Sequence, residues 1–214
     1  MSFGTYFEYL GVAALWTIGL SATAVVGGGI LGFAIALLRT APSRILAAIA
    51  AAYIQIVQGI PLLVLLFISY FGLSIVGLDL NPFIAVAIAF SLYSAAFLGE
   101  IWRGAIQAVP KTQWEASACL GFARHHQLVH VVLPQAVRIS IPPTVGFVVQ
   151  VVKNTSLASV IGFIELTRAG QIINNATFQP FRVFLVVAAI YFCICYPLSY
   201  LSKKLEIKLH VANR

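Results

Sequence analysis

Polar side chains suited to recognising a charged solute gather in one short part of an otherwise apolar chain. Asn154, Thr155 and Ser156 follow a long apolar run, and Glu165 and Arg168 come after eight further, mainly apolar residues. A carboxylate and a guanidinium can form charge-assisted hydrogen bonds to the two charged groups of a zwitterion. Because Glu165 and Arg168 are three residues apart, they can instead pair with each other on one helical face. The segment therefore predicts either a contact to a charged ligand or an ion pair between Glu165 and Arg168.

A second polar segment, Trp114 to Pro134, carries the signals of a short helix. Thr112 and Glu115 have the T-x-x-E spacing of a capping box, in which hydroxyl and carboxylate satisfy free backbone donors. Gly121 suits the left-handed conformation that ends a helix. A helix of about eight residues is not stable alone in water. It therefore needs a surface to pack on, supplied by the rest of the chain or by another protein.

Signals for catalysis and metal binding are weak. His126 and His130 have the i, i+4 spacing of a metal site, but no third ligand or carboxylate base accompanies them. The sequence contains no P-loop, no G-x-S-x-G motif and no dinucleotide-binding glycine motif. We expect no catalytic residue, no metal site and no cofactor in this chain.

The composition requires a lipid bilayer as the solvent. The chain is 61% hydrophobic and 9% charged, with a mean hydropathy of +0.98, whereas soluble domains are about 25% charged. A transmembrane helix needs about 20 mainly apolar residues. The charge-poor runs predict an all-α membrane protein, a single domain over residues 1–214, with five spans. These spans are 10–38, 50–77, 80–103, 130–152 and 183–202, and a polar loop covers 110–134.

The basic residues predict how the chain is oriented in the membrane. Ten of them fall on one side of the predicted spans, namely Arg39, Arg44, Arg103, Lys111, Arg124, Arg138, Lys203, Lys204, Lys208 and Arg214. The other side has only Lys153, Arg168 and Arg182. The positive-inside rule then places the N-terminus outside and the C-terminus in the cytoplasm. The formal net charge of +7 reflects this topology, so we expect no nucleic-acid binding.

Two local patterns are expected to organise the spans. Gly28 and Gly32 form a G-x-x-x-G motif, which lets another helix approach closely, either within the chain or at a subunit boundary. Glu100 and Arg103 are three residues apart and are expected to form a structural ion pair.

The second polar segment resembles the EAA loop of permease subunits of ATP-binding-cassette importers, whose pattern is E-A-A-x3-G-x9-I-x-L-P. The matching residues are Glu115, Ala116, Ser117, Gly121, Val131, Leu133 and Pro134, with serine and valine replacing the second alanine and the isoleucine. The resemblance implies a type I importer permease core in which this segment is the coupling helix of the ATPase. It implies an ATPase-coupling role for Thr112, Glu115, Ala116, Ser117, Gly121, Leu133 and Pro134.

Other stretches resemble the branch that imports histidine, arginine, glutamine, glutamate and related polar amino acids. They are LGEIWRG at 98–104, AIQAVPKTQWE at 105–115 and VKNTSLASVIGFIELTRAGQ at 152–171. Where that branch has Arg-Gly-Thr-Pro, this chain has Gln58, Gly59, Ile60 and Pro61, which lacks the cation and the hydroxyl. The residues expected on the substrate pathway are Gln58, Gly59, Pro61, Asn154, Thr155, Ser156, Glu165 and Arg168.

The resemblance also implies partners and a location. A dimer of cytoplasmic ATPase subunits would bind ATP and Mg, so hydrolysis would take place in a separate chain. A second permease, identical or homologous, would complete the membrane domain, and an extracytoplasmic amino-acid-binding protein would deliver the substrate. The implied location is the bacterial cytoplasmic (inner) membrane, as a multi-pass protein.

Two other classes of membrane protein remain as alternatives. A secondary transporter or channel would act without an ATPase, but the buried ionisable relays and inverted repeat typical of that class are missing from the predicted spans. A membrane-embedded enzyme would need a nucleophile with a base, or metal ligands, within the spans, and their single histidine is His130, at the first residue of the fourth span.

Overall fold

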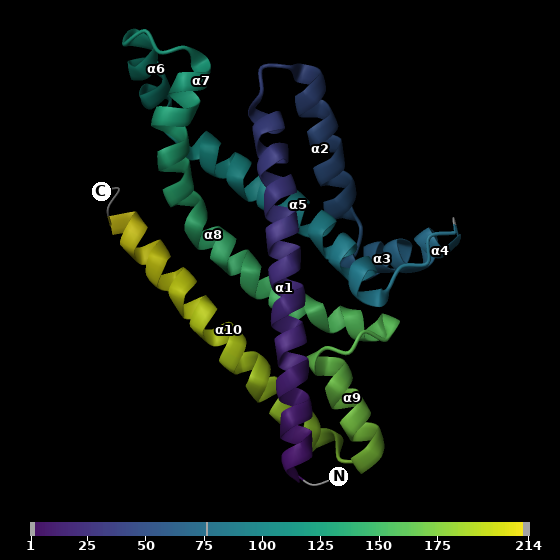
Figure 1. The fold of residues 1–214 in the computed structure, drawn as a ribbon. Coiled ribbons are helices and arrows are strands. Elements are labelled where there is room, and N and C mark those ends of the chain that lie inside the picture. The colour runs from purple at the N-terminus through teal and green to yellow at the C-terminus, as the bar shows by residue number, and fades with distance from the viewer. Residues whose placement is uncertain (1–2, 76, 212–214) are drawn as a thin grey trace.

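The computed structural model describes residues 3–75 and 77–211, which form helices of several kinds and no strand (Figure 1). Arg214, counted above among the basic residues of the tail, lies outside the described residues. The α-helices are α1 (Phe3–Thr40), α2 (Arg44–Gly59), α3 (Leu62–Phe67), α4 (Leu73–Ile75), α5 (Pro82–Ala108), α6 (Lys111–Cys119), α7 (Arg124–His126), α8 (Leu133–Asn154), α9 (Leu166–Thr177) and α10 (Pro180–Val211). Two π-helical segments, η1 (Ile68–Gly72) and η2 (Gln127–Val132), and a 3₁₀ helix, η3 (Thr155–Ile161), connect them.

Four helical rods in the described residues are long and apolar enough to cross a membrane. They are Thr5–Thr40, Pro82–Ala108, Arg124–Ile161 and Pro180–Leu209. The rod Arg124–Ile161 joins α7, η2, α8 and η3, so it begins six residues before the predicted fourth span and ends nine residues after it. If the bent pair α2 and α3–α4 is counted as one span, the described residues contain five.

The second predicted span, 50–77, is not one straight helix. Arg44–Gly59 and Leu62–Ile75 are bent by 101° at the break between them. Ile60 has an extended backbone, with φ −106° and ψ 130°. A proline disfavours helical backbone at the preceding residue, and Pro61 then opens α3. The Gly59-Ile60-Pro61 sequence therefore turns the chain sharply within the apolar region.

Helices α1 and α5 pack through the predicted glycine motif. A Cβ added to Gly28 would lie 2.3 Å from the Ser94 Cβ and 2.9 Å from the Ser91 carbonyl oxygen. At the next turn, Gly32 faces Gly99, with backbone atoms about 3 Å from an added Cβ on either residue. The G-x-x-x-G motif thus serves a contact within the chain.

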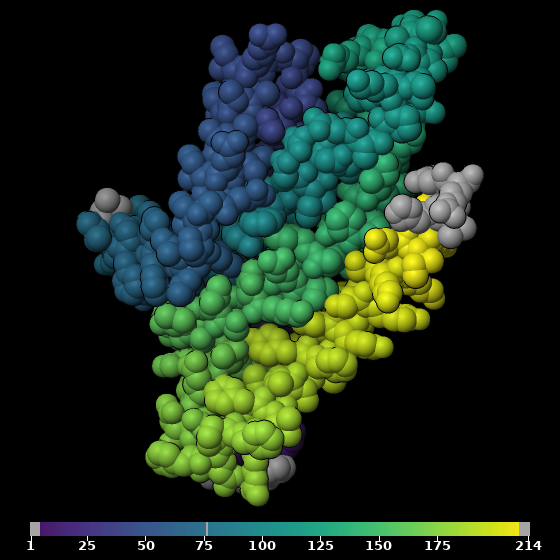
Figure 2. Space-filling model, turned by 180° about the vertical axis from the view of Figure 1, so that it is seen from behind, coloured from purple at the N-terminus to yellow at the C-terminus, as the bar shows by residue number. Residues whose placement is uncertain are grey.

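The two ends of the molecule are built from different helices. Helices α6 and α7 lie at one end, beside the turn between α1 and α2, and α9 lies at the other end with the start of α1 (Figure 1). Viewed from behind, the α1–α2 end and the α6–α7 end form two lobes standing side by side (Figure 2). Along α1, large apolar side chains such as Leu15, Val26 and Ile30 are exposed, as expected for a surface that meets lipid or another membrane subunit.

Candidate functional site

Helix α6 is short, as the sequence predicts, but it begins differently. Pro110 is the N-cap, with φ −55° and ψ 138°, and no side chain caps the helix there. The predicted capping box of Thr112 and Glu115 is therefore wrong, because Thr112 is already the second residue of the helix. Proline has no N–H to satisfy and its ring presets the backbone angle at which the chain enters the helix. The Thr112 and Glu115 side chains are left free to face outward, and both are exposed.

The end of α6 follows the prediction. Gly121 has φ +81°, the left-handed region. The N–H of Phe122 donates to the Ser117 carbonyl at 3.1 Å, and the N–H of Gly121 donates to the Ala118 carbonyl at 2.9 Å. This pair of bonds satisfies the last carbonyls of the helix and turns the chain back towards α7.

The seven proposed coupling residues divide between an inward and an outward face. Ser117 is buried and its hydroxyl donates to the Trp114 carbonyl at 2.8 Å. Trp114 and Leu133 pack against the buried cluster of Ala105, Ile106, Val109, Val132 and Ala136, which joins the end of α5 to the start of α8. Thr112, Glu115, Ala116, Gly121 and Pro134 are exposed. Helix α6 is thus fixed to two membrane helices on one side and free on the other.

Pro134 explains the wide turn that precedes α8. It lies at the first turn of α8, directly after the π-helical segment η2. Because proline donates no backbone hydrogen bond, the regular ladder is interrupted here, and π-helical turns arise at such interruptions. The Gln135 amide bonds the Val131 carbonyl at 2.8 Å and the Gln113 side-chain oxygen at 3.4 Å. Gln135 therefore links α8 directly to α6.

Two apolar side chains at the tip of this segment were not predicted as site residues. Leu120 is 76% exposed and Phe122 is 42% exposed, on either side of Gly121. Together they form a small exposed apolar spot at the tip of the segment. Their position beside the helix-ending glycine is the signal that could have identified them.

Six of the eight predicted pathway residues lie around the bend and η3. Gln58, Gly59 and Pro61 are exposed at the 101° bend, and α3 contacts η3, which begins with Thr155 and Ser156. The residues that flank the bend, Val57 and Leu62, are buried in the same cluster as Ala158 of η3. The side chain of Asn154 lies near Tyr93 of α5. The structure thus brings these six residues to one half of the molecule.

Glu165 caps helix α9 from a fully buried position. Its carboxylate accepts hydrogen bonds from the N–H of Thr167 at 2.9 Å, the N–H of Arg168 at 2.8 Å and the Tyr191 hydroxyl at 2.8 Å. The next residue, Leu166, donates its N–H to the Thr17 hydroxyl of α1 at 3.2 Å. Burial raises the pKa of the Glu165 carboxyl, and the three hydrogen bonds oppose that shift. Glu165 therefore ties α9 to α10, while its neighbour ties α9 to α1.

Arg168 does not pair with Glu165 through its side chain. Its guanidinium donates to the Gln171 side-chain oxygen at 3.1 Å. Within the described residues, one ion pair has its charged atoms closer than 4.0 Å, and it is the predicted pair of Glu100 and Arg103. The Arg103 Nε lies 2.8 Å from Glu100 Oε2. The Glu165–Arg168 ion pair is thus not formed, because the carboxylate is taken up by backbone donors. Tyr191, whose hydroxyl also reaches Thr155 and Thr167, was missed because nothing in its local sequence marks it.

Removing the Glu165 carboxylate should destabilise the protein far more than removing the Arg168 charge. Glu165→Ala leaves the two part-buried N–H groups of Thr167 and Arg168 without their side-chain acceptor and removes the bond from the Tyr191 hydroxyl, which together costs roughly 3 kcal/mol. At this chain length that lowers the melting temperature by about 10 °C. Arg168→Gln should change the stability by about 0.5 kcal/mol or less. Thermal unfolding in detergent measures both, and an equal loss in the two variants would contradict the capping role.

The comparisons with known proteins agree with this architecture. Residues 28–210 match the family described as the inner membrane component of binding-protein-dependent transport systems. The chain is 36% identical to a probable glutamine ABC transporter permease protein, GlnM, of Bacillus subtilis over 194 residues, 89% of this chain and 90% of the relative. It is 37% identical to the L-cystine transport system permease protein TcyB of the same organism over 206 residues, 96% and 88% of the two chains.

A solved structure supports the same assignment. The crystal structure of an amino acid ABC transporter with histidines superposes with a TM-score of 0.90 at 32% identity, covering 95% of each chain. The expected all-α fold of a type I importer permease is therefore confirmed. The location in the bacterial inner membrane follows from the same family. The chain belongs to the binding-protein-dependent transport system inner membrane components, the permease subunits of ATP-binding-cassette importers.

Proposed function

We propose that this permease carries a polar amino acid into the cytoplasm and that α6 is the joint through which an ATPase drives it. The observation that carries the proposal is the two-sided construction of α6, which is anchored by Trp114 and Ser117 and exposes Thr112, Glu115 and Ala116. An exposed short helix that is rigidly attached to the ends of two spans can transmit a push from a partner. In this account α6 lies in the cytoplasm, together with the C-terminus, and the N-terminus lies outside.

The long rod that begins at Arg124 and ends at Ile161 supplies the mechanical connection. At 1.5 Å per residue its 38 residues span about 57 Å. One end carries η2 and α8, which pack with α6, and the other end carries Thr155 and Ser156 of η3. Displacement of α6 therefore moves Thr155 and Ser156 through continuous helical backbone, with no flexible loop between the two ends. Pro142 and Pro143 lie inside this rod, where missing backbone hydrogen bonds permit bending.

The composition of the complex follows from the same proposal. The chain itself is not catalytic and holds no cofactor, and the ATPase dimer binds ATP and Mg. A second permease, identical or homologous, faces this one across the pathway. A binding protein outside the cell delivers the solute to the end that carries α9. The substrate class is supported by relatives that transport glutamine and cystine and by a structural neighbour solved with histidines.

Reconstitution into proteoliposomes tests this function against the alternative of a transporter that acts alone. The permease with its ATPase, ATP and binding protein should take up radiolabelled glutamine, cystine or histidine, while the permease alone should take up none. A sodium or proton gradient should not replace ATP. Uptake by the permease alone under an ion gradient would instead favour the secondary transporter, and a panel of amino acids measured in the same vesicles would identify the substrate.

A further inference from the structure

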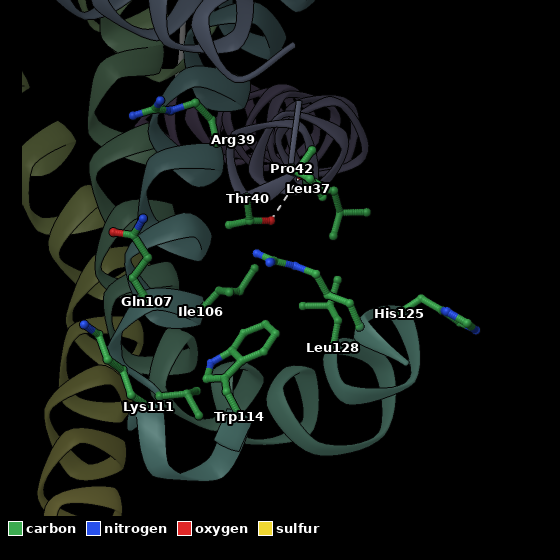
Figure 3. A pocket seen from close by; sticks show the side chains of 13 residues that line it. Leu37, Arg39, Thr40, Pro42, Ile106, Gln107, Lys111, Trp114, His125 and Leu128 are labelled. Atoms are coloured by element: carbon green, nitrogen blue, oxygen red, sulfur yellow. Dashed lines mark hydrogen bonds between the residues drawn. The ribbon is translucent and has the colours of Figure 1, made fainter. Parts of the chain in front are cut away.

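A large recess opens where α1, α5, α6 and α7 meet. It has a volume of about 990 Å³, and its lining includes Thr40 and Ile106 together with Trp114 and Leu128 (Figure 3). The recess lies at the ends of two membrane helices, because α1 ends at Thr40 and α5 at Ala108. Thr40 and Ala108 lie two and five residues beyond the ends of the predicted spans 10–38 and 80–103, so in this account the recess lies near the boundary between the apolar layer and the lipid headgroups.

The lining of this recess is basic. Arg39, Lys111, Arg124 and His125 contribute to it, and it contains no acidic side chain. The Arg39 head points away from the hollow (Figure 3), bonds the Ala47 carbonyl at 3.4 Å and lies in the field of Glu100. Lys111 and Arg124 are exposed and form no ion pair within the described part of the chain, and the Lys111 head lies at the outer edge of the hollow beside Gln107 (Figure 3). Two cations at the rim are thus available for an anion.

A second hollow, an apolar groove, lies next to this recess. It has a volume of about 330 Å³ and lies between α1, α5 and α8, with Phe33, Trp102, Val137 and Ile141 in its lining. Ile106 lines both hollows. Val137 is 54% exposed and Phe33 is 46% exposed, so the groove is open at the side. The cationic recess and the apolar groove therefore adjoin at the Ile106 side chain.

We infer that this pair of hollows binds one anionic phospholipid, with its phosphate on Lys111 and Arg124 and an acyl chain in the Phe33–Trp102–Val137–Ile141 groove. Charge complementarity supports the headgroup, because basic pockets beside membrane helices attract anionic lipid headgroups. A free phosphate would leave the apolar groove empty, whereas a phospholipid would fill both hollows. The lipid would lie against the inner side of α6, at Trp114. The outward residues Thr112, Glu115 and Ala116 do not line the recess, so lipid and ATPase occupy different faces of α6.

Tryptophan quenching by brominated lipid tests the site in the intact permease–ATPase complex. The chain has three tryptophans, of which Trp102 lines the groove. Trp16 is 49% exposed and stands against Phe83 and Phe163, away from both hollows. Variants that retain only Trp102 or only Trp16, with phenylalanine at the other two positions, are placed in phosphatidylcholine nanodiscs. Each disc contains the same small fraction of either acyl-brominated phosphatidylglycerol or acyl-brominated phosphatidylcholine. The fluorescence of a complex with a tryptophan-free permease is subtracted, because it comes from the other proteins of the disc.

The expected result is a headgroup preference at Trp102 and none at Trp16. Brominated phosphatidylglycerol should quench Trp102 more strongly than brominated phosphatidylcholine, and each cation removed should lower the preference about fivefold. Lys111→Gln combined with Arg124→Gln should abolish it, while Arg182→Gln, at the opposite end of the molecule, should not. Unchanged quenching of Trp16 by brominated phosphatidylcholine shows that a variant is folded.

Three results would overturn the lipid site. The first is equal quenching of Trp102 by the two lipids, which means that the groove has no headgroup preference or is covered by the second permease or the ATPase. The second is displacement of brominated phosphatidylglycerol by millimolar inorganic phosphate, which would make the recess a site for free anions. The third is a preference that survives removal of both cations. None of these measurements depends on which solute is transported, so they can fail while the proposed transport function stands.

Discussion

A Glu115→Lys variant is expected to lose ATP-driven uptake by about tenfold or more while the permease keeps its fold. Glu115 is exposed on the outward face of α6, and its side chain makes no hydrogen bond to another described residue. Its replacement therefore disturbs nothing inside the chain. If this face sits on the ATPase, a reversed charge opposes its counterpart there, and a like-charge contact at an interface costs several kcal/mol. Each 1.4 kcal/mol weakens association about tenfold.

Three measurements on the reconstituted complex check this expectation. Uptake of labelled substrate and substrate-stimulated ATP hydrolysis should both fall, and the retention of the ATPase on an affinity-tagged permease should weaken. Glu8→Lys is the matched control. It makes the same charge change at an exposed position near the N-terminal end of α1, far from α6. Wild-type uptake by Glu115→Lys would show that α6 does not meet the ATPase through this face.

Gly28→Val is expected to prevent α1 from packing on α5. The added Cβ would meet the Ser94 Cβ at 2.3 Å, and the Ser91 carbonyl oxygen and the Ala95 amide nitrogen lie within about 3 Å of the same point. Backbone atoms of a packed helix cannot move aside as the tip of a side chain can. Overpacking of this kind lowers the free energy of unfolding by about 3 kcal/mol. The melting temperature should fall by roughly 10 °C or more.

Gly19→Val provides the matched control on the same helix. An added Cβ at Gly19 has no neighbour within 4 Å, and both substitutions carry the same β-branched penalty. Size-exclusion chromatography and thermal unfolding in detergent should show a monodisperse, stable Gly19→Val protein and an aggregated or unstable Gly28→Val protein. Equal behaviour of the two variants would mean that the close approach of α1 and α5 is not required for the fold.

The features that could be predicted from the sequence are those determined by short spacings. The G-x-x-x-G contact, the Glu100–Arg103 pair and the left-handed Gly121 each depend on residues within one or two helical turns. The apolar runs likewise predict helices long enough to span a membrane. Local physical rules suffice for these because neighbouring residues on a helix are held in a known geometry.

The features that could not be predicted depend on distant partners or on competition between local signals. Thr112 and Glu115 match a capping box, but Pro110 already supplies the backbone geometry that starts α6. Glu165 and Arg168 have ion-pair spacing, yet the carboxylate is taken by backbone donors and by a hydroxyl 26 residues away. The contact of α9 with Thr17 joins residues 149 apart. Spacing alone could not rank these tertiary contacts above the local pair.

The bend in the second predicted span lies between these cases. Gly59 and Pro61 mark the break, but from the sequence they are expected on the substrate pathway, within a span predicted over 50–77. The size of the bend, 101°, depends on packing instead. Val57 before it and Leu62 after it are buried in one cluster with Phe90 of α5 and Phe147 of α8.

The central claim, that α6 is the cytoplasmic joint with an ATPase, is tested most directly by labelling Cys119. This cysteine is exposed at the end of α6, and alanine at Cys193 and Cys195 leaves it as the single thiol of the chain. A membrane-impermeant maleimide should label Cys119 in inside-out vesicles stripped of the ATPase, and adding the ATPase back should protect it. In right-side-out vesicles no labelling is expected. Labelling of Cys119 from the outside, or labelling from the inside that the ATPase does not slow, would contradict the account.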